Sequence, residues 1–362
     1  MRSILFLTDN LRYHGQVRQL TLLAPALPAD RFRTEIFSLR GPGPLAAELR
    51  VGGQRSRLAA PVENLYELRK SLASRRPDLL HVWGLPALRS LWWLTLLKRS
   101  LVPPLVISVH ASQLKQQRLQ FLDRQMLSRV RVFAVDDESQ RDAFANAGVP
   151  LERLRIVRPG VAIPEVSDAA GRFRAESGIT RDDCLFLSVG HFESPYRSLD
   201  TLWAFEIVRG IEPAMNLILI GDGPYRQRVA NIYYYASQPG NGVQFHAPRP
   251  DAAQMLTQAD AVITGHRRSG GTYAVLEGMA AGKPVIATQL PHLQALIQNG
   301  ETGFLVPSGK PPGISRVTLQ LIREPALRLR IGEAGRAYVE RHHRVDAMAD
   351  AFAGIYDDVL LA

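Results

Sequence analysis

The sequence predicts an α/β protein made of two doubly wound domains, each with a parallel sheet covered by helices. The chain has 362 residues, enough for about two domains of roughly 150 to 200 residues each. Short apolar runs alternate with longer amphipathic segments, which is the pattern of parallel strands joined by crossover helices. This alternation stops near residues 157–164 and then begins again.

The first half contains five runs with strand character, at residues 4–8, 34–38, 79–83, 105–109 and 131–135. Each later run follows a helical or mixed segment, so we expect the strands to be parallel. We place the domain boundary between residues 163 and 164, because two prolines and a glycine interrupt both periodicities there.

The second half repeats this alternation of strand and helix patterns, with strand-like runs at residues 184–189, 216–220, 242–245, 261–264 and 284–287. Helical patterns at 199–210 and 272–281 separate some of these runs. Residues 345–361 carry apolar side chains close to one helical face, so we expect a helix packed on a core. Ligands of such sheets bind at the carboxyl ends of the strands, and two domains facing each other would form a cleft.

Cysteine content and segment lengths favour a cytoplasmic protein. Cys184 is the single cysteine, so no internal disulfide or multi-cysteine metal site can form. The first apolar run is too short for a secretory signal. Residues 91–97, the most apolar run, fall far short of the roughly 20 residues that a membrane-spanning helix needs.

Positive charge is concentrated in the first half. Residues 1–164 hold 25 Lys and Arg against 13 Asp and Glu, a net charge of +12, and the remainder is −2. This bias suggests an anionic partner, such as a phospholipid surface, a phosphorylated acceptor or nucleic acid. The alternative is dispersed, solvated surface charge.

A tryptophan pair, Trp92 and Trp93, lies in the apolar run that Arg89, Lys98 and Arg99 flank. One interpretation is docking of the N-terminal domain on anionic lipid at the cytoplasmic face of a membrane. The other interpretation buries residues 91–97 as a core helix.

The most informative stretch is residues 269–284. Gly270 and Gly271 follow a strand, and Thr272 is expected to cap the next helix. Glycines before a helix N-terminus form a ready anion site, since unpaired amides and the helix dipole favour a phosphate. An ordinary capped helix is the alternative. Glu277, more than one turn further, either accepts two ribose hydroxyls or faces solvent.

Two other glycine-containing segments do not match the nucleotide-binding motifs that they partly resemble. Residues 221–223 lack the third glycine of a dinucleotide fingerprint because position 226 is Arg226. Gly282 and Lys283 lack a phosphate-binding loop because Glu277 stands where that loop requires glycine.

We predict no metal site and no cofactor. His342 and His343 are adjacent and do not share a helix face. No zinc spacing occurs, and the acidic residues 136–138 in one short loop are weak support for magnesium.

In this order the motifs resemble the family 4 (group 1) glycosyltransferases, and the resemblance covers nearly the whole chain. That family has the GT-B fold, two Rossmann-like domains facing across a cleft, and transfers sugars from nucleotide diphosphate donors with retention. Residues 13–20 stand where the family has a glycine-rich loop, and Gly15 keeps one of its two glycines. His110 matches a histidine near the transferred sugar, and residues 157–161 resemble the hinge motif.

In the second half, Gly190 followed by Arg197 resembles the segment that holds the donor diphosphate, and residues 220–224 resemble a glycine turn. Glu277 matches the second glutamate of the family's pair, which binds the ribose. Three departures concern the same site. Ser269 replaces the first glutamate, His191 replaces an arginine, and Arg197 replaces a lysine with a shift of one residue.

The resemblance implies a retaining, metal-independent transferase that moves a sugar to a glycan or lipid-linked acceptor in bacterial cell-surface polysaccharide or glycolipid synthesis. Residues 1–163, with 345–362 packing back on them, would form the acceptor side, and 164–344 would bind the nucleotide sugar co-substrate. The implied catalytic residues are His110 and Arg197. The implied donor-binding residues are Gly15, Gly190, His191, Arg197, Ser269, Gly270, Gly271, Thr272, Tyr273 and Glu277.

An alternative from another class remains open. Loss of the carboxylate at Ser269 also fits a degenerate GT-B protein that binds a nucleotide sugar or glycan without turnover, as a scaffold. Binding to nucleic acid would rest only on the basic first half, with no recognised module or stacking motif, and we expect no nucleic-acid partner.

Overall fold

The structure is a computed structural model. It describes residues 1–12, 15–40, 43, 45–46, 49, 57–58, 65–97, 102–110, 127–165, 169–180, 182–192, 195–236, 242–249, 251–266 and 270–361, without the side chains of residues 57–58, 65–67, 92–97, 169–172 and 195–197. The chain divides into two compact units. Unit 1 comprises Met1–Gly160 and Val345–Ala362, and unit 2 comprises Val161–Arg344. The division falls three residues before the boundary that the sequence suggests.

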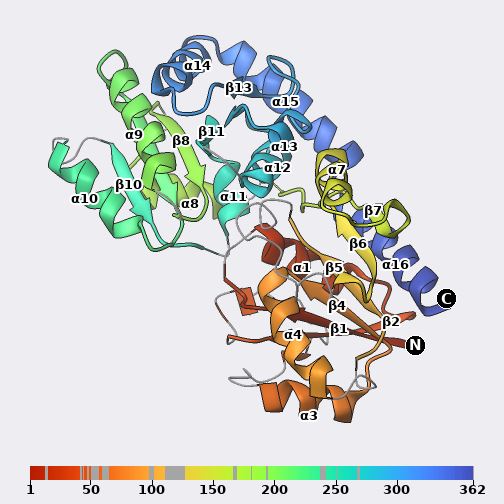
Figure 1. Ribbon diagram of the computed structural model, residues 1–362. Helices are drawn as coiled ribbons and strands as arrows, with labels where there is room; N and C mark the ends of the chain where they lie inside the picture. Colours follow the sequence, from red (N-terminus) through yellow and green to blue (C-terminus); the bar gives the residue numbers. More distant parts are fainter. Residues whose placement is uncertain are drawn as a thin grey trace. The chain divides into compact units, whose positions relative to one another are not determined.

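Unit 1 is a seven-stranded parallel sheet in the order β3-β2-β1-β4-β5-β6-β7 (Figure 1). Its elements are β1 (Arg2–Thr8), α1 (Gly15–Ala26), β2 (Phe32–Ser38), β3 (Arg57–Leu58), α3 (Leu65–Arg75), β4 (Leu79–Trp83), α4 (Leu85–Leu97), β5 (Leu105–Ser108), β6 (Val130–Val135), α7 (Glu138–Asn146), η2 (Leu151–Arg153), β7 (Leu154–Ile156) and α16 (Val345–Leu361). The strands are rich in Leu, Ile and Val because helices cover both faces of the sheet.

The two faces of this sheet carry separate cores. On one face, α1 and α16 pack on strand residues that include Ile4, Phe6 and Val106. On the other face, α3, α4 and α7 pack on residues that include Leu5 and Leu80. Alternation of side chains along each strand explains why neighbours such as Ile4 and Leu5 join different cores.

Helix α16 follows unit 2 in the sequence but belongs to the core of unit 1, and it is the dark blue helix beside β2 and β6 in Figure 1. Its buried face includes Met348, Phe352, Ile355, Tyr356 and Val359, which confirms the expected helix packed on a core. The helix also brings four aspartates and no lysine or arginine, so the net charge of unit 1 is +8 rather than +12.

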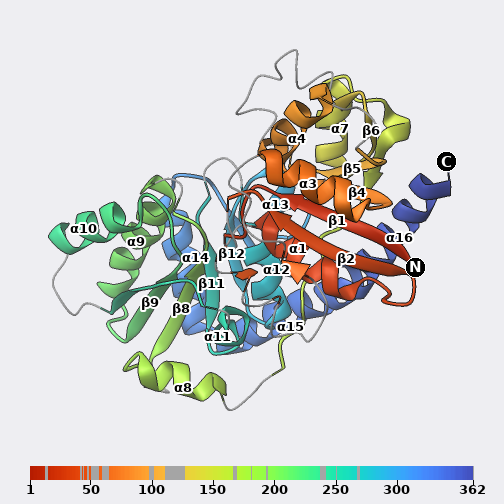
Figure 2. The ribbon, with the colours of Figure 1, turned by 90° about the horizontal axis from the view of Figure 1, so that it is seen from below.

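Unit 2 is a six-stranded parallel sheet in the order β10-β9-β8-β11-β12-β13 (Figure 2). Its elements are α8 (Ala169–Glu176), β8 (Cys184–Val189), α9 (Pro195–Arg209), β9 (Met215–Ile220), α10 (Arg226–Ala236), β10 (Val243–His246), α11 (Ala252–Leu256), β11 (Ala261–Thr264), α12 (Thr272–Ala280), β12 (Val285–Thr288), α13 (Pro291–Gln294), β13 (Phe304–Val306), α14 (Pro311–Arg323) and α15 (Pro325–His342). Helices α9, α10 and α14 cover one face, and α11, α12 and α13 cover the other.

The chain passes between the units twice, and the two passages lie side by side. Val161 forms an isolated parallel bridge with Arg344, and the Val161 amide donates to the carbonyl of His343 at 2.8 Å. Within unit 1, the Gly160 amide lies 3.2 Å from Sδ of Met348. The first and last residues of unit 2 are therefore paired with each other.

The predicted strands 79–83, 184–189 and 261–264 are confirmed at both ends. The other predicted strands are confirmed within one or two residues at each end. Three strands were not predicted: β3, β7 and β13, each with two or three residues. No helix among the described residues is long and apolar enough to span a bilayer. The side chains of Trp92 and Trp93, to which the lipid-docking prediction refers, lie outside the described part of the chain.

Candidate functional site

The topology of unit 2 defines one edge for ligand binding. Strand order reverses between β8 and β11, which are neighbours in the sheet, and ligands of doubly wound sheets bind beyond the carboxyl ends of the strands at this switch point. Gly190 and His191 directly follow β8. His266, Gly270 and Gly271 follow β11 and precede α12.

The segment after β8 is held by the glycine turn after β9. The Gly190 amide donates to the carbonyl of Ile220 at 3.0 Å, and the Phe192 amide donates to that of Asp222 at 2.9 Å. A Cβ added to Gly221 would lie 1.9 Å from the carbonyl oxygen of Gly190. Glycine at 221 therefore serves close packing of two backbones, which accounts for a glycine turn without a third glycine.

The N-terminus of α12 is built from two left-handed glycines. Gly270 and Gly271 have φ values of 91° and 92°, a conformation that glycine adopts at little cost. Gly271 is the N-cap, and Val275 donates to its carbonyl at 2.8 Å. The expectation that Thr272 caps the helix is wrong, because the left-handed Gly271 occupies the cap and Thr272 is the first helical residue.

Two histidines that no sequence pattern singled out contact this turn. A Cβ on Gly270 or Gly271 would lie 2.9 Å or 2.8 Å from the imidazole of His266, which is itself buried. Nε2 of His292 in α13 lies 2.9 Å from the carbonyl oxygen of Gly270. A glycine pair after a strand indicates that another group approaches the backbone closely there. It does not indicate which residue that is.

Helix α12 leaves one line of side chains partly accessible. Residues 274–276 and 278–280 are buried, whereas Tyr273 and Glu277 are partly exposed. These two positions are four residues apart and share a face of the helix. Glu277 therefore lies on the accessible face that begins at the glycine turn.

Two of the site residues predicted from the sequence fall outside what the structure describes. Ser269 lies in the undescribed residues 267–269. Arg197 lies in the first turns of α9, but its side chain is not described. The prediction that Arg197 faces the donor diphosphate therefore stays a prediction.

In unit 1, His110 lies two residues beyond β5, at the carboxyl edge of the sheet, and Gly15 is the first residue of α1. Burial lowers the pKa of His110, and the charge of Asp137 acts in the opposite direction. At neutral pH the imidazole is therefore neutral, and its lone pair can accept a hydrogen bond.

Two of the acidic residues after β6 bind the first turn of α7. Asp137 is the N-cap of α7 and accepts from the Gln140 amide at 2.8 Å, and Asp136 accepts from Nε2 of Gln140 at 3.0 Å. Among the residues that the structure describes, no three His, Cys, Asp or Glu side chains are grouped to hold a metal ion.

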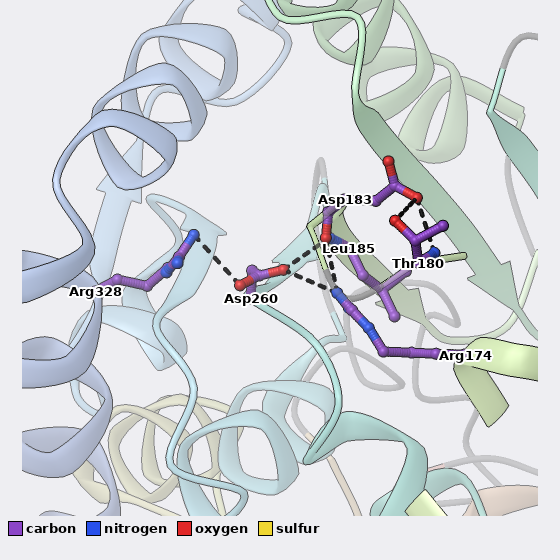
Figure 3. Close-up of polar contacts among 6 residues, drawn as sticks. All are labelled: Arg174, Thr180, Asp183, Leu185, Asp260 and Arg328. Carbon is purple, nitrogen blue, oxygen red and sulfur yellow. Dashed lines mark hydrogen bonds and ion pairs between the residues drawn. The ribbon is translucent and has the colours of Figure 1, made fainter. Parts of the chain in front are cut away.

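A charged cluster around Asp260 lies at the opposite edge of the sheet of unit 2, at the start of β11. Figure 3 shows its side chains. Asp260, which directly precedes β11, accepts from the Leu185 amide at 2.8 Å and pairs with Arg174 at 3.5 Å and Arg328 at 3.3 Å. Burial lowers the pKa of nearby Lys283. The cluster thus joins α8, α15 and the sheet. It lies where the strands begin, whereas the ligand edge is where they end.

Comparisons with known proteins cover both units. Residues 13–163 match the family described as Glycosyltransferase Family 4, and residues 170–338 match Glycosyl transferases group 1. The chain is 27% identical over 194 residues to the N-acetyl-alpha-D-glucosaminyl L-malate synthase of Bacillus anthracis, which is 52% of this chain and 49% of that protein. This match thus spans about half of the relative's length.

Two further comparisons extend over almost the whole chain. The phosphatidyl-myo-inositol mannosyltransferase of Mycobacterium leprae is 25% identical over 357 residues, 94% of this chain and 87% of that protein. The crystal structure of Anabaena HepE with UDP-glucose superposes with a TM-score of 0.83 at 18% identity, covering 99% of this chain and 100% of that one. At this identity the structural likeness shows a common fold.

Proposed function

Because the chain belongs to the family 4 (group 1) glycosyltransferases and has their GT-B fold, we propose that it transfers a sugar from a nucleotide diphosphate donor to a glycan or lipid-linked acceptor. Retention of anomeric configuration and independence of metal are part of the proposal. Unit 2 binds the donor, and unit 1 supplies the acceptor side.

One observation carries the donor assignment: both loops at the switch point of unit 2 present glycine backbone. The Gly190 segment follows β8, and Gly270 and Gly271 open α12 after β11. The first amides of a helix have no partner within it, and together with the helix dipole they favour a phosphate group. A diphosphate bound there meets the amides of Gly271, Thr272 and Tyr273.

The chemistry requires neutralisation of the leaving group. As the bond between the anomeric carbon and the diphosphate oxygen breaks, negative charge grows on the phosphate. Hydrogen-bond donors and cations aimed at that charge lower the barrier. The amides of the α12 turn and Arg197 supply this stabilisation. The acceptor oxygen then bonds to the anomeric carbon on the face that the phosphate leaves, and the leaving phosphate takes the acceptor proton. His110 contacts the transferred sugar, and the carboxylate of Glu277 accepts hydrogen bonds from the ribose hydroxyls.

Ser269 stands where the family has a carboxylate, and we propose that it marks a changed donor. A serine can still accept a hydrogen bond from a sugar hydroxyl, but without a formal charge. The enzyme would then act on a sugar whose hydroxyls do not require that glutamate.

A panel of nucleotide diphosphate sugars tests the function. The proposal expects at least one donor to be hydrolysed slowly alone and faster with an acceptor, with release of the nucleoside diphosphate. If no donor is hydrolysed or transferred and Ser269→Glu creates activity, the second candidate holds, namely a degenerate protein that binds a nucleotide sugar or glycan without turnover.

We further propose that the acceptor is anionic or presented at an anionic membrane surface at the cytoplasmic face. The net charge of +8 on unit 1 supports this, since basic residues near such a surface each contribute about 1 kcal/mol. Sedimentation with vesicles at low salt tests it. Binding to anionic vesicles that is lost in 1 M salt supports docking, and equal binding to neutral vesicles, or none to either, leaves an acceptor in solution.

A further inference from the structure

The peptide that joins Gly270 and Gly271 is held by a side chain from a different element. Nε2 of His292 lies 2.9 Å from the carbonyl oxygen of Gly270. A carbonyl oxygen only accepts, so this nitrogen carries the hydrogen and donates it. His292 is the second residue of α13, which follows β12, the next strand in the sheet after β11.

The planarity of the peptide bond makes this contact directional. In a trans peptide, the Gly270 carbonyl and the Gly271 amide lie in one plane and point in opposite directions, and the structure has no cis peptide among its described residues. Fixing the carbonyl toward His292 therefore aims the Gly271 amide away from His292. That amide is the first of the series at the N-terminus of α12.

Two consecutive glycines would not keep this orientation by themselves. Glycine moves between left-handed and right-handed conformations more readily than any other residue. His266 restricts the turn by contact, since its ring lies where Cβ atoms of both glycines would be. His292 adds the polar contact that selects the orientation of the peptide plane.

We propose that His292 is a positioning residue for the donor diphosphate, because its hydrogen bond to Gly270 holds the Gly271 amide in the orientation that receives a phosphate oxygen. The inference rests on the proposed function and goes beyond it by assigning a residue outside the glycine turn. It acts through the backbone and not by contact with the donor. Removing the imidazole N–H should weaken recognition of the phosphates and leave recognition of the base and ribose unchanged.

The test compares variants that keep or lose a hydrogen-bond donor at position 292. His292→Leu and His292→Asn lose it, because leucine has no N–H and asparagine is too short to place its amide at Nε2. His292→Gln keeps an N–H at about the same distance from the backbone. Gln294→Leu, an exposed position of the same short helix, is the matched control. Thermal unfolding of each variant establishes that it is folded.

The probes are the nucleoside diphosphate that binds the wild type most tightly and the corresponding nucleoside without phosphate. His292→Leu and His292→Asn should bind the diphosphate about 3-fold to 10-fold more weakly, the range expected for one hydrogen bond, and the nucleoside as the wild type does. His292→Gln and Gln294→Leu should bind both as the wild type does.

Two results overturn the inference alone: unchanged affinity for the diphosphate in both loss variants, or equal weakening for the diphosphate and the nucleoside. A wild type that binds no nucleoside diphosphate overturns the proposed function, and the inference falls with it. The two failures are therefore distinguishable.

Discussion

The imidazole of His81 and the phenol of Tyr356 are joined in the core of unit 1, with Nδ1 of His81 2.7 Å from Oη of Tyr356. On its other side, Nε2 of His81 lies 2.9 Å from Oγ of Ser108. The three residues come from β4, α16 and β5 and are buried. The last helix of the chain is thus tied to the sheet of the first unit by a polar contact as well as by apolar packing.

Removing the phenol hydroxyl should destabilise the protein. Tyr356→Phe deletes one partner and leaves a ring nitrogen of His81 buried without it, so we expect the free energy of unfolding to fall by about 1 to 3 kcal/mol. Denaturant unfolding measures this. Tyr338→Phe, whose hydroxyl donates to the carbonyl of Ala295 at an exposed site, is the control and should cost under about 0.5 kcal/mol. Equal losses in the two variants would contradict the account.

Acid should destabilise the protein through His81. Burial lowers the pKa of His81 from 6.5 to about 3. Above pH 6.5 the residue is neutral in both states and contributes nothing to pH dependence. Between pH 6.5 and 3 only the unfolded chain binds the proton, so stability falls by about 1.4 kcal/mol per pH unit. His81→Gln should remove this slope between pH 6.5 and 5, and a slope equal to that of the wild type would refute the assignment.

Two helical glycines should respond to alanine with opposite signs. Gly354 in α16 is exposed, and a Cβ there meets nothing within 4 Å. Gly354→Ala should therefore stabilise the protein by about 0.5 to 1 kcal/mol through helix propensity. Gly332 in α15 gains the same propensity, but its Cβ would lie 2.1 Å from the carbonyl oxygen of Gly282, so Gly332→Ala should destabilise. The same sign for both variants in thermal unfolding would contradict the close packing of α15 on Gly282.

The charged cluster at the amino edge of unit 2 should matter for stability and not for the donor. Asp260→Asn removes the carboxylate that pairs with both Arg174 and Arg328, and we expect the free energy of unfolding to fall by about 2 kcal/mol, below the value for a fully buried pair because these side chains are 14–23% exposed. The control Glu212→Gln breaks a more exposed pair with Arg323 and should cost at most about 1 kcal/mol. Weaker nucleotide binding in Asp260→Asn, measured where the variant is fully folded, would contradict the statement that this cluster lies away from the donor site.

The sequence predicts the elements that have several buried residues in a clear period. Strands at 79–83, 184–189 and 261–264 and the helix at 345–361 follow from their apolar patterns. Strands of two or three residues, such as β3 and β13, are too short to show a period, and pairing with a neighbouring strand defines them instead.

Sequence reasoning reaches the glycine turn before α12 because that turn lies within one continuous segment, while its role in binding stays a prediction. The glycine pair before α12 and the accessible position of Glu277 follow from residues 269–284 alone. The cap was assigned to Thr272 because threonine is a good cap, but the left-handed Gly271 replaces it. His266 and His292 approach the turn through the order of strands in the sheet, which no local pattern contains.

Binding of a nucleoside diphosphate to wild type and Glu277→Gln, measured by calorimetry, tests the central claim most directly. Glu277 lies on the accessible face of α12 and is assigned to the ribose, so the amide should weaken binding by about 1 to 3 kcal/mol, the cost of losing a charge-assisted hydrogen bond, while the unfolding temperature stays unchanged. Affinity equal to that of the wild type for every nucleoside diphosphate that binds would contradict the assignment of this helix as the donor site.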